Sequence, residues 1–195
     1  MECGCDEVGR GSAVAEIYVC ACILNPNYEI DGLRDSKKLS ARKRELLAEE
    51  IKRHAISWCI ATASLEEIEL LNVHQATLLA MKRAVEGLRI RPDKVFVDGN
   101  HVPKISLPVE AIVKGDDLIP AISAASILAK VARDQALLDY HRIYPNYGFD
   151  SHKGYLTKAH IEALQKHGPC PIHRKTYAPI RKLLEKPQYV QGKMF

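Results

Sequence analysis

The 195-residue sequence predicts an α/β domain with a small helical extension at its C-terminal end. Short, apolar, strand-like runs alternate with segments of helical spacing, which is the pattern of strands joined through helices. Two of these runs stop abruptly at polar loops that contain acidic residues. Hydrophobic residues make up 47% of the chain and charged residues 27%, so a core of ordinary size is available.

The first two strands are expected over residues 1–6 and 16–24. A glycine-containing turn joins them, which predicts an antiparallel hairpin. Asn25-Pro26-Asn27 then ends the second strand as a turn.

The chain has six cysteines, and four of them form two C-x-C pairs within the predicted hairpin, Cys3 with Cys5 and Cys20 with Cys22. On a strand this spacing puts both thiols of a pair on one face, as expected of neighbouring strands that line a core. Structural zinc sites usually have roughly two to four residues between paired cysteines. We therefore favour reduced, mostly buried thiols over a zinc site.

A helix is expected to begin at Ser40, a suitable N-cap, and to run to about Lys52. Its predicted apolar stripe consists of Leu46, Leu47 and Ile51.

A third strand is expected near residues 54–63, followed by a short acidic helix that Ser64 caps. A separate helix is expected over 74–87. Its apolar positions at helical spacing are Leu78, Met81 and Val85.

Residues 94–98 and 109–113 read as two further strands, which brings the expected number to five. Ligands of such sheets gather outside the carboxyl ends of the parallel strands. Asp98 and Asp116 both lie at such ends in this interpretation.

The segment 121–140 has the strongest helical pattern, and its small residues would permit close approach to the sheet. Residues 144–155 are expected to form an ordered aromatic loop, followed by helices over 157–167 and 179–184. We expect residues 1–185 to form one domain and residues 186–195 a flexible tail.

The acidic residues Asp6, Glu7, Asp98 and Asp116 are the candidate metal ligands. Four carboxylates held close together repel one another unless a cation lies between them, and Mg²⁺ prefers such oxygen ligands. Other interpretations remain open for each residue. A regular strand sends Asp6 and Glu7 to opposite sides, Asp98 could simply form a turn, and Asp117 competes with Asp116.

Gly9-Arg10-Gly11 follows the first acidic pair and could bring its backbone close to a ligand. It lacks the spacing and the lysine of a phosphate-binding P-loop. From the residues alone, we favour the simpler interpretation, a hairpin turn.

His152-Lys153-Gly154-Tyr155 could supply a stacking ring and a phosphate contact, or the aromatic residues could only anchor their loop. The eight histidines are scattered and are expected to be mostly surface or structural residues.

The net charge of +4 is a mild basic bias, concentrated near residues 34–38, 42–44 and 173–175. Together with an acidic metal site, these clusters favour a polyanionic substrate. No stretch has the length of a membrane span and the start lacks a signal-peptide pattern, so we expect no membrane association and a cytoplasmic location.

The chain resembles the ribonuclease HII family, the prokaryotic type 2 ribonucleases H, over nearly its whole length. Six stretches carry the resemblance in the family's order and spacing: Asp6–Gly11, Asp35–Ser40, Val97–Asn100, Lys114–Asp116, Ile122–Val131, and Tyr147–Phe149 with His152–Tyr155.

The resemblance implies a ribonuclease H-like fold with a mixed five-stranded sheet flanked by helices. It also implies an endoribonuclease that hydrolyses the RNA strand of RNA–DNA hybrids and cleaves 5′ of single ribonucleotides in duplex DNA. Two divalent ions, Mg²⁺ or Mn²⁺, would be bound by Asp6, Glu7, Asp98 and Asp116, which decides for Asp116 over Asp117. Water would attack in line and leave 3′-hydroxyl and 5′-phosphate ends.

By the same resemblance, the backbone of Gly9, Arg10 and Gly11 would sense the ribose 2′-hydroxyl. Tyr155 would pack on the sugar of the next nucleotide, and Lys37 would contact a phosphate. After Gly11 the family usually continues with Pro-Leu and then a further Gly, whereas this sequence departs from that motif over residues 12–16. Ser12 and Ala15 change the backbone freedom of the turn, and Glu16 adds a carboxylate. We expect a monomer.

Overall fold

The computed structural model describes residues 1–33 and 36–185, so the predicted tail over 186–195 lies outside the described residues. Five strands form one mixed sheet in the order β3-β2-β1-β4-β5. The strands are β1 (Glu2–Val8), β2 (Ile17–Ile23), β3 (Ser57–Ala63), β4 (Lys94–Asp98) and β5 (Val109–Ile112). The predicted α/β class and mixed sheet are confirmed.

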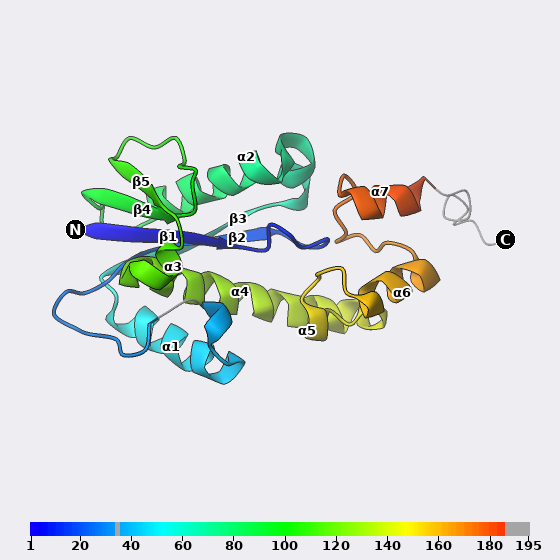
Figure 1. Ribbon diagram of the computed structural model, residues 1–195, viewed down its shortest axis with the longest axis horizontal. Helices are drawn as coiled ribbons and strands as arrows, with labels where there is room; N and C mark the ends of the chain where they lie inside the picture. Colours follow the sequence, from blue (N-terminus) through cyan, green and yellow to red (C-terminus); the bar gives the residue numbers. More distant parts are fainter. Residues whose placement is uncertain (34–35, 186–195) are drawn as a thin grey trace.

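The helices and helical turns lie on both faces of the sheet and beyond one end of it (Figure 1). They are η1 (Ser36–Lys38), α1 (Ala41–His54), α2 (Leu65–Glu86), α3 (Gly115–Leu118), α4 (Pro120–Ile143), η2 (Pro145–Tyr147), α5 (Phe149–His152), α6 (Lys158–His167) and α7 (Ala178–Leu184). In Figure 1, α2 covers one face of the sheet, and α4 with α1 covers the other. Among the described residues, no helix is long and apolar enough to cross a membrane.

β1 and β2 pair antiparallel, as the hairpin pattern predicts, and β1 pairs parallel with β4. Each C-x-C pair lies on one face, but the two pairs face opposite ways. Cys3 and Cys5 belong to the core under α2, whereas Cys20 and Cys22 belong to the core under α1 and α4. All six thiols are unpaired, and burial raises the pKa of Cys3 to about 12.

α1 begins where the sequence predicts, because the Ser40 side chain accepts a hydrogen bond from the N–H of Lys43. The predicted stripe is wrong at Leu46, whose side chain is 61% exposed. Leu47 and Ile51 are buried with Ala48 between them. Successive helical residues are turned by about 100°, so only one of the adjacent leucines can face the sheet.

α2 joins the two helices that the sequence predicts on either side of a break. Ser64 and Glu67 form a reciprocal capping box at its start. Asn72 has φ 67° and ψ 163°, which kinks the element, and its side chain accepts the N–H groups of His74 and Gln75. Asn72 therefore acts as the N-cap of the second half.

α4 lies against the middle of the sheet at unusually short range. A Cβ added to Gly4 would lie 2.1 Å from the carbonyl carbon of Ala121 and 2.2 Å from the nitrogen of Ile122. The start of α4 is buried and made of small residues, including Ser123 and Ala124. The predicted close approach of this helix is confirmed, and Gly4 is the residue on the sheet that permits it.

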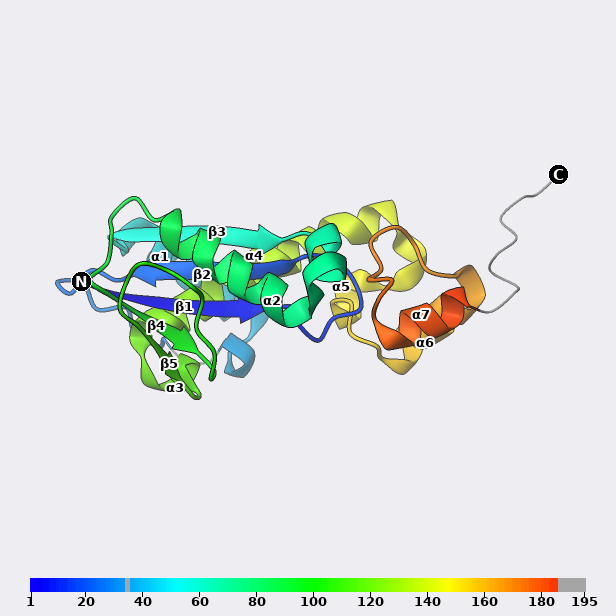
Figure 2. The ribbon, with the colours of Figure 1, turned by 90° about the horizontal axis from the view of Figure 1, so that it is seen from above.

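The C-terminal helices form a small separate core at the far end of α4 (Figure 2). The segment predicted as a loop contains two short helical turns, η2 and α5, because Gly148 between them adopts φ 71° and ends the first. Tyr147 and Phe149 are buried and anchor the segment. Ala13, Val14 and Ala15, from the β1–β2 connection, are buried in the same core.

Candidate metal centre and substrate loop

Three of the four predicted acidic residues converge at the carboxyl ends of the parallel strands. Carboxylate oxygens of Asp6, Asp98 and Asp116 all lie within 4.8 Å of one another. Such a set of hard oxygen donors fits a divalent cation. Asp6 and Asp116 are buried and Asp98 is half-buried, so the cluster is largely shielded from solvent but still accessible at Asp98.

The sheet register explains the first contact. Cys5 pairs with Val97 across β1 and β4, so the next residues, Asp6 and Asp98, follow side by side. The third residue, Asp116, follows the turn after β5, in which Lys114 adopts the left-handed conformation with φ 58°. The N–H of Gly115 donates to Asp98 Oδ1 at 2.7 Å, which ties α3 to the end of β4.

The like charges of the cluster repel one another. Burial, followed by the charges of Glu7 and Asp98, raises the pKa of Asp6 well above its usual value. A hydrogen bond from Ser126 acts in the opposite direction. A buried carboxylate with like-charged neighbours is the electrostatic pattern that a bound cation relieves.

Glu7 is not part of the three-carboxylate cluster. It follows Asp6 on a regular strand, and the alternation of side chains sends it toward the other face, as the sequence predicts. Its Oε1 lies 3.4 Å from Arg10 Nη1. Glu7, Arg10 and Asp98 line a cavity of 80 Å³ together with Asn100.

The structure separates the two candidates Asp116 and Asp117. Asp116 joins the cluster, whereas Asp117 accepts hydrogen bonds from Lys38 Nζ at 2.7 Å on both oxygens. Lys37 Nζ lies 3.8 Å from Asp116 Oδ2, and its side chain is 79% exposed. A cation at this place can contact a phosphate that approaches the cluster.

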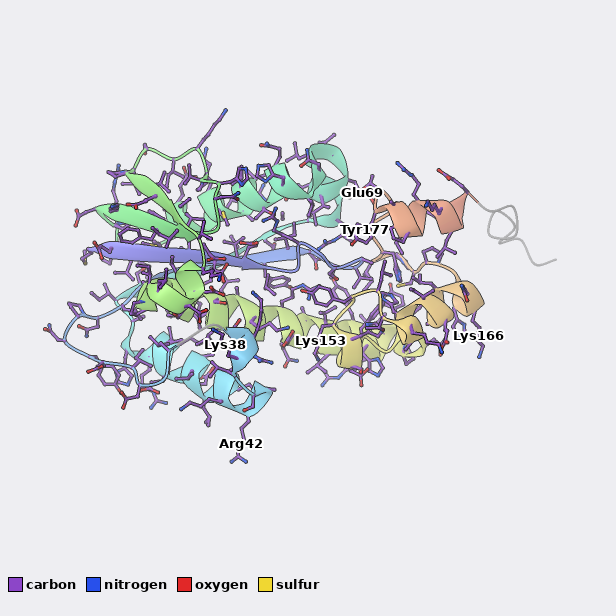
Figure 3. All side chains as sticks on the ribbon, viewed as in Figure 1. Lys38, Arg42, Glu69, Lys153, Lys166 and Tyr177 are labelled. Atoms are coloured by element: carbon purple, nitrogen blue, oxygen red, sulfur yellow. The ribbon has the colours of Figure 1, made fainter. Side chains whose placement is uncertain are left out.

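The η1 turn that carries these lysines is fixed to α4 and α1. Ser36 Oγ lies 2.9 Å from Ser126 Oγ, and Arg44 Nη1 donates to the carbonyls of Ser36 and Leu39 at 2.9 Å and 2.6 Å. Arg34 and Asp35, which belong to the predicted basic cluster and the resemblance, lie outside the described residues. Figure 3 shows Lys38 and Arg42 on the side of the molecule where α1 lies.

Two buried arginines hold the segment from Gly9 to Ala15. Arg174 donates through Nε and Nη2 to the carbonyl of Ala15 at 2.9 Å and 2.8 Å, and through Nη1 to the carbonyl of Arg10 at 2.9 Å. Gly9 has φ 100°, and a Cβ there would lie 2.3 Å from Arg133 Nε. The segment is therefore shaped by guanidinium groups from α4 and the C-terminal region.

Sequence reasoning missed both arginines. Arg174 belongs to the basic cluster at 173–175, which by itself indicates a solvated face, yet its side chain is buried. Arg133 lies in the predicted helix near Lys130 and Asp134, a pattern typical of a solvated helix face, so nothing in the sequence indicates that it is buried.

Tyr155 lies beside the Gly9–Gly11 loop. A Cβ added to Gly11 would be 3.7 Å from Tyr155 Cε1, so the ring is in contact range of the loop. The Tyr155 side chain remains 41% exposed, unlike the other loop aromatics Tyr147 and Phe149. The loop thus presents one exposed ring next to exposed backbone, at the end of the strand that carries Asp6.

A family model described as Ribonuclease HII matches residues 3–180 of the chain. The chain belongs to the ribonuclease HII family. Ribonuclease HII from Desulforamulus reducens is 72% identical over 195 residues, which cover 100% of this chain and 98% of the relative. The family resemblance that the sequence motifs predict is confirmed.

Solved structures agree with the ribonuclease HII assignment. The chain is similar to ribonuclease H2 from Pyrococcus horikoshii OT3, with a TM-score of 0.81, 25% identity and coverage of 97% of this chain and 99% of that one. Bst-RNase HIII, solved in complex with Mn²⁺, shares the fold at 16% identity, with a TM-score of 0.69 and coverage of 94% and 68%. As a member of the ribonuclease HII family, the protein is a metal-dependent ribonuclease H that acts on RNA–DNA hybrids.

The departure from the ribonuclease HII motif over residues 12–16 is accommodated by specific contacts. Ser12 is buried and its Oγ donates to the carbonyl of Val14 at 3.0 Å. Glu16 accepts a hydrogen bond from the Tyr140 hydroxyl at 2.9 Å. Ala15 has φ 61°, a left-handed conformation that strains any residue with a Cβ.

We expect Ala15→Gly to raise the free energy of unfolding by roughly 1 kcal/mol, because glycine removes the left-handed strain. The matched control is Ala13→Gly, at a neighbouring buried position without positive φ, which should lose stability instead. Urea unfolding of the three proteins measures both effects. Destabilisation by Ala15→Gly would show that the lost packing of the buried Ala15 methyl group, and not the backbone strain, dominates at this position.

Proposed function

We propose that this ribonuclease H also cleaves duplex DNA on the 5′ side of a single embedded ribonucleotide, leaving 3′-hydroxyl and 5′-phosphate ends. The observation that carries the proposal is the placement of Tyr155 and Gly11 in contact range at the end of the strand that brings Asp6 into the carboxylate cluster. A nucleic-acid strand that binds here contacts the Gly9–Gly11 backbone, the Tyr155 ring and the carboxylate cluster at the same time.

In this proposal, Asp6, Asp98 and Asp116 hold two divalent ions, Mg²⁺ or Mn²⁺, with Glu7 from the adjoining cavity. When bound, the ions supply activation of the attacking water and neutralise charge on the phosphate during in-line displacement. The N–H of Gly115 donates a hydrogen bond to Asp98 Oδ1 and so holds this carboxylate in position to bind an ion.

The remaining residues orient the substrate. The carbonyls of Arg10 and Ala15 accept hydrogen bonds from Arg174, so the backbone around Gly9, Arg10 and Gly11 is fixed before a substrate arrives. A backbone group held in this way can distinguish a ribose 2′-hydroxyl from the hydrogen of deoxyribose. Lys37 lies beside Asp116 and can contact a phosphate oxygen.

The test offers three duplexes in Mg²⁺ and in Mn²⁺: one with a single ribonucleotide, an otherwise identical all-DNA duplex, and an RNA–DNA hybrid. We expect cleavage of the first and third only, with the cut 5′ of the ribonucleotide. Cleavage of the all-DNA duplex would contradict ribonucleotide sensing. Cleavage of the hybrid alone would contradict the embedded-ribonucleotide activity while leaving hybrid cleavage intact.

Tyr155→Ala should lower kcat/KM on the single-ribonucleotide duplex about tenfold to a hundredfold, since removing a stacking ring costs roughly 1–3 kcal/mol. The matched control is Tyr28→Ala, because Tyr28 is 38% exposed and its side chain contacts α1, where its ring stacks on His54 and its hydroxyl donates to Glu50. Equal losses for both variants would show that the effect is not specific to the ring beside Gly11.

We also propose that the protein is a monomer, which light scattering tests.

A further inference from the structure

Three histidines gather around Phe149 in the small C-terminal core. The rings of His152 and His160 stack with centroids 4.4 Å apart, and those of His160 and His173 are 5.4 Å apart. His160 and His173 are fully buried. Phe149 contacts all three rings at 5.6 Å to 6.0 Å.

Hydrogen bonds join two of these rings into a chain with a fixed direction. His173 Nδ1 faces three groups of Cys170: the backbone N–H at 2.9 Å, the thiol at 3.1 Å and the carbonyl at 3.2 Å. The N–H is the nearest and donates, which makes Nδ1 an acceptor and leaves the proton on Nε2. His173 Nε2 lies 3.1 Å from His160 Nε2, which must therefore accept. His160 Nδ1–H is then left to donate to the carbonyl of Tyr155, 3.0 Å away.

The Tyr155 end sets the direction, because a backbone carbonyl can only accept and His160 Nδ1 must therefore carry the proton. At the other end the N–H of Cys170, which can only donate, lies closer to His173 Nδ1 than the Cys170 carbonyl does. The two ends require the same pair of tautomers, and each neutral ring uses one donor and one acceptor. Burial lowers the pKa of His160 and of His173 to about 4, so both rings are neutral near pH 7.

This chain of hydrogen bonds ends at the backbone of Tyr155, the residue with the exposed ring. The Tyr155 carbonyl also accepts the N–H of Thr157 at 2.8 Å. The preceding residue, Gly154, accepts at its carbonyl the N–H of Ala13 at 3.0 Å, and its own N–H donates to His152 Nδ1 at 3.2 Å. The backbone on both sides of Tyr155 is thus held by imidazoles and by the β1–β2 connection.

We propose that His160, oriented by His173, is a positioning residue that fixes the backbone of Tyr155 so that its ring lies against Gly11 for the substrate sugar. This inference rests on the proposed role of Tyr155 in substrate binding. The imidazole pair touches neither substrate nor metal, and it acts through the Tyr155 carbonyl.

Two substitutions at His160 separate this role from a packing role. His160→Asn places an amide N–H near the position of Nδ1 and can keep the donor to Tyr155, while it loses the contact with His173. His160→Gln places its amide near the position of Nε2, keeps a partner for His173 and loses the donor to Tyr155. Both remove a similar part of the ring, so their effects on stability should be similar.

We expect His160→Gln to lower kcat/KM on the single-ribonucleotide duplex about tenfold, the effect of one lost hydrogen bond, and His160→Asn to stay within about twofold. Amide hydrogen exchange at Tyr155 and Thr157 should accelerate in the Gln variant only. Equal losses in both variants, in proportion to their melting temperatures, would overturn the positioning role.

Amide hydrogen exchange is measured without substrate, so it tests the imidazole chain independently of activity. Failure of the wild-type protein to cut the single-ribonucleotide duplex would overturn the proposed function and leave the exchange result valid. The wild-type protein supplies a further check if a variant does not fold. Nitrogen-15 shifts of the imidazoles should show the Nδ1–H tautomer for His160 and the Nε2–H tautomer for His173. The opposite tautomer at His160 would overturn the inference.

Discussion

Asp98→Asn should reduce kcat on an RNA–DNA hybrid about a thousandfold or more, because the cation site is expected to contribute several kcal/mol of charge stabilisation. Asp98 contributes a carboxylate to the three-residue cluster and accepts the N–H of Gly115. Asparagine keeps the size and one acceptor but removes the charge that holds a cation. Single-turnover cleavage assays over a range of Mg²⁺ and Mn²⁺ concentrations measure the loss.

The same substitution should raise the melting temperature of the metal-free protein. The charges of Glu7 and Asp98 add to burial in raising the pKa of Asp6, so the folded protein binds that proton more tightly than the unfolded chain does. The stability of the metal-free protein therefore falls as the pH rises through the folded-state pKa of Asp6. Removing the Asp98 charge lessens this loss, whereas added metal should stabilise the wild type more than the variant.

Asp117→Asn is the matched control, because Asp117 adjoins Asp116 but pairs with Lys38 outside the cluster. It should keep hybrid cleavage within about twofold, as for an exposed ion pair of small energetic value. An Asp98→Asn variant that retains most of its activity, or an Asp117→Asn variant that loses it, would contradict the assignment of the cluster.

Gly4→Ala should destabilise the fold by about 3 kcal/mol or more, the upper range for overpacking a core. Its Cβ would lie 2.1 Å from the backbone of Ala121, where no side chain can move aside. Because the start of α4 is the part that must shift, and Ser126 beside Asp6 belongs to that helix, weaker metal binding should accompany the lost stability. Chemical denaturation and metal titration measure the two effects.

Gly11→Ala is the control for stability, since its Cβ meets nothing closer than 3.7 Å. Its free energy of unfolding should lie within about 0.5 kcal/mol of the wild-type value, as for other surface substitutions. Equal stability of Gly4→Ala and Gly11→Ala would show that α4 can move away from the sheet without cost.

The strand and helix pattern was predictable where local chemistry decides it. Ser40 and Ser64 cap helices as their sequences indicate, and β1 and β2 form the predicted hairpin. The prediction was wrong at Leu46, because spacing alone does not say which of two adjacent leucines faces the sheet. The two short helical turns in the aromatic segment were not predicted, because elements of three or four residues are too short to show a periodic pattern.

The candidate site was predictable as a set of residue types, with Asp98 and Asp116 at strand ends and Tyr155 in its loop. The buried arginines and the imidazole chain were not. Arg174 contacts the β1–β2 connection, 159 residues away in sequence, and His173 contacts α6 across an irregular link of the chain. A charged or titratable side chain reads as solvated until its burial is known.

The sequence by itself determined the acidic pair that opens the chain, the strand that carries it and the family to which the chain belongs. Only the tertiary structure decided that Asp6 joins Asp98 and Asp116 while Glu7 faces a neighbouring cavity. The physical reason is the register between β1 and β4, together with the alternation of side chains along a strand. Register depends on which strands pair, and pairing depends on contacts that no local stretch of sequence contains.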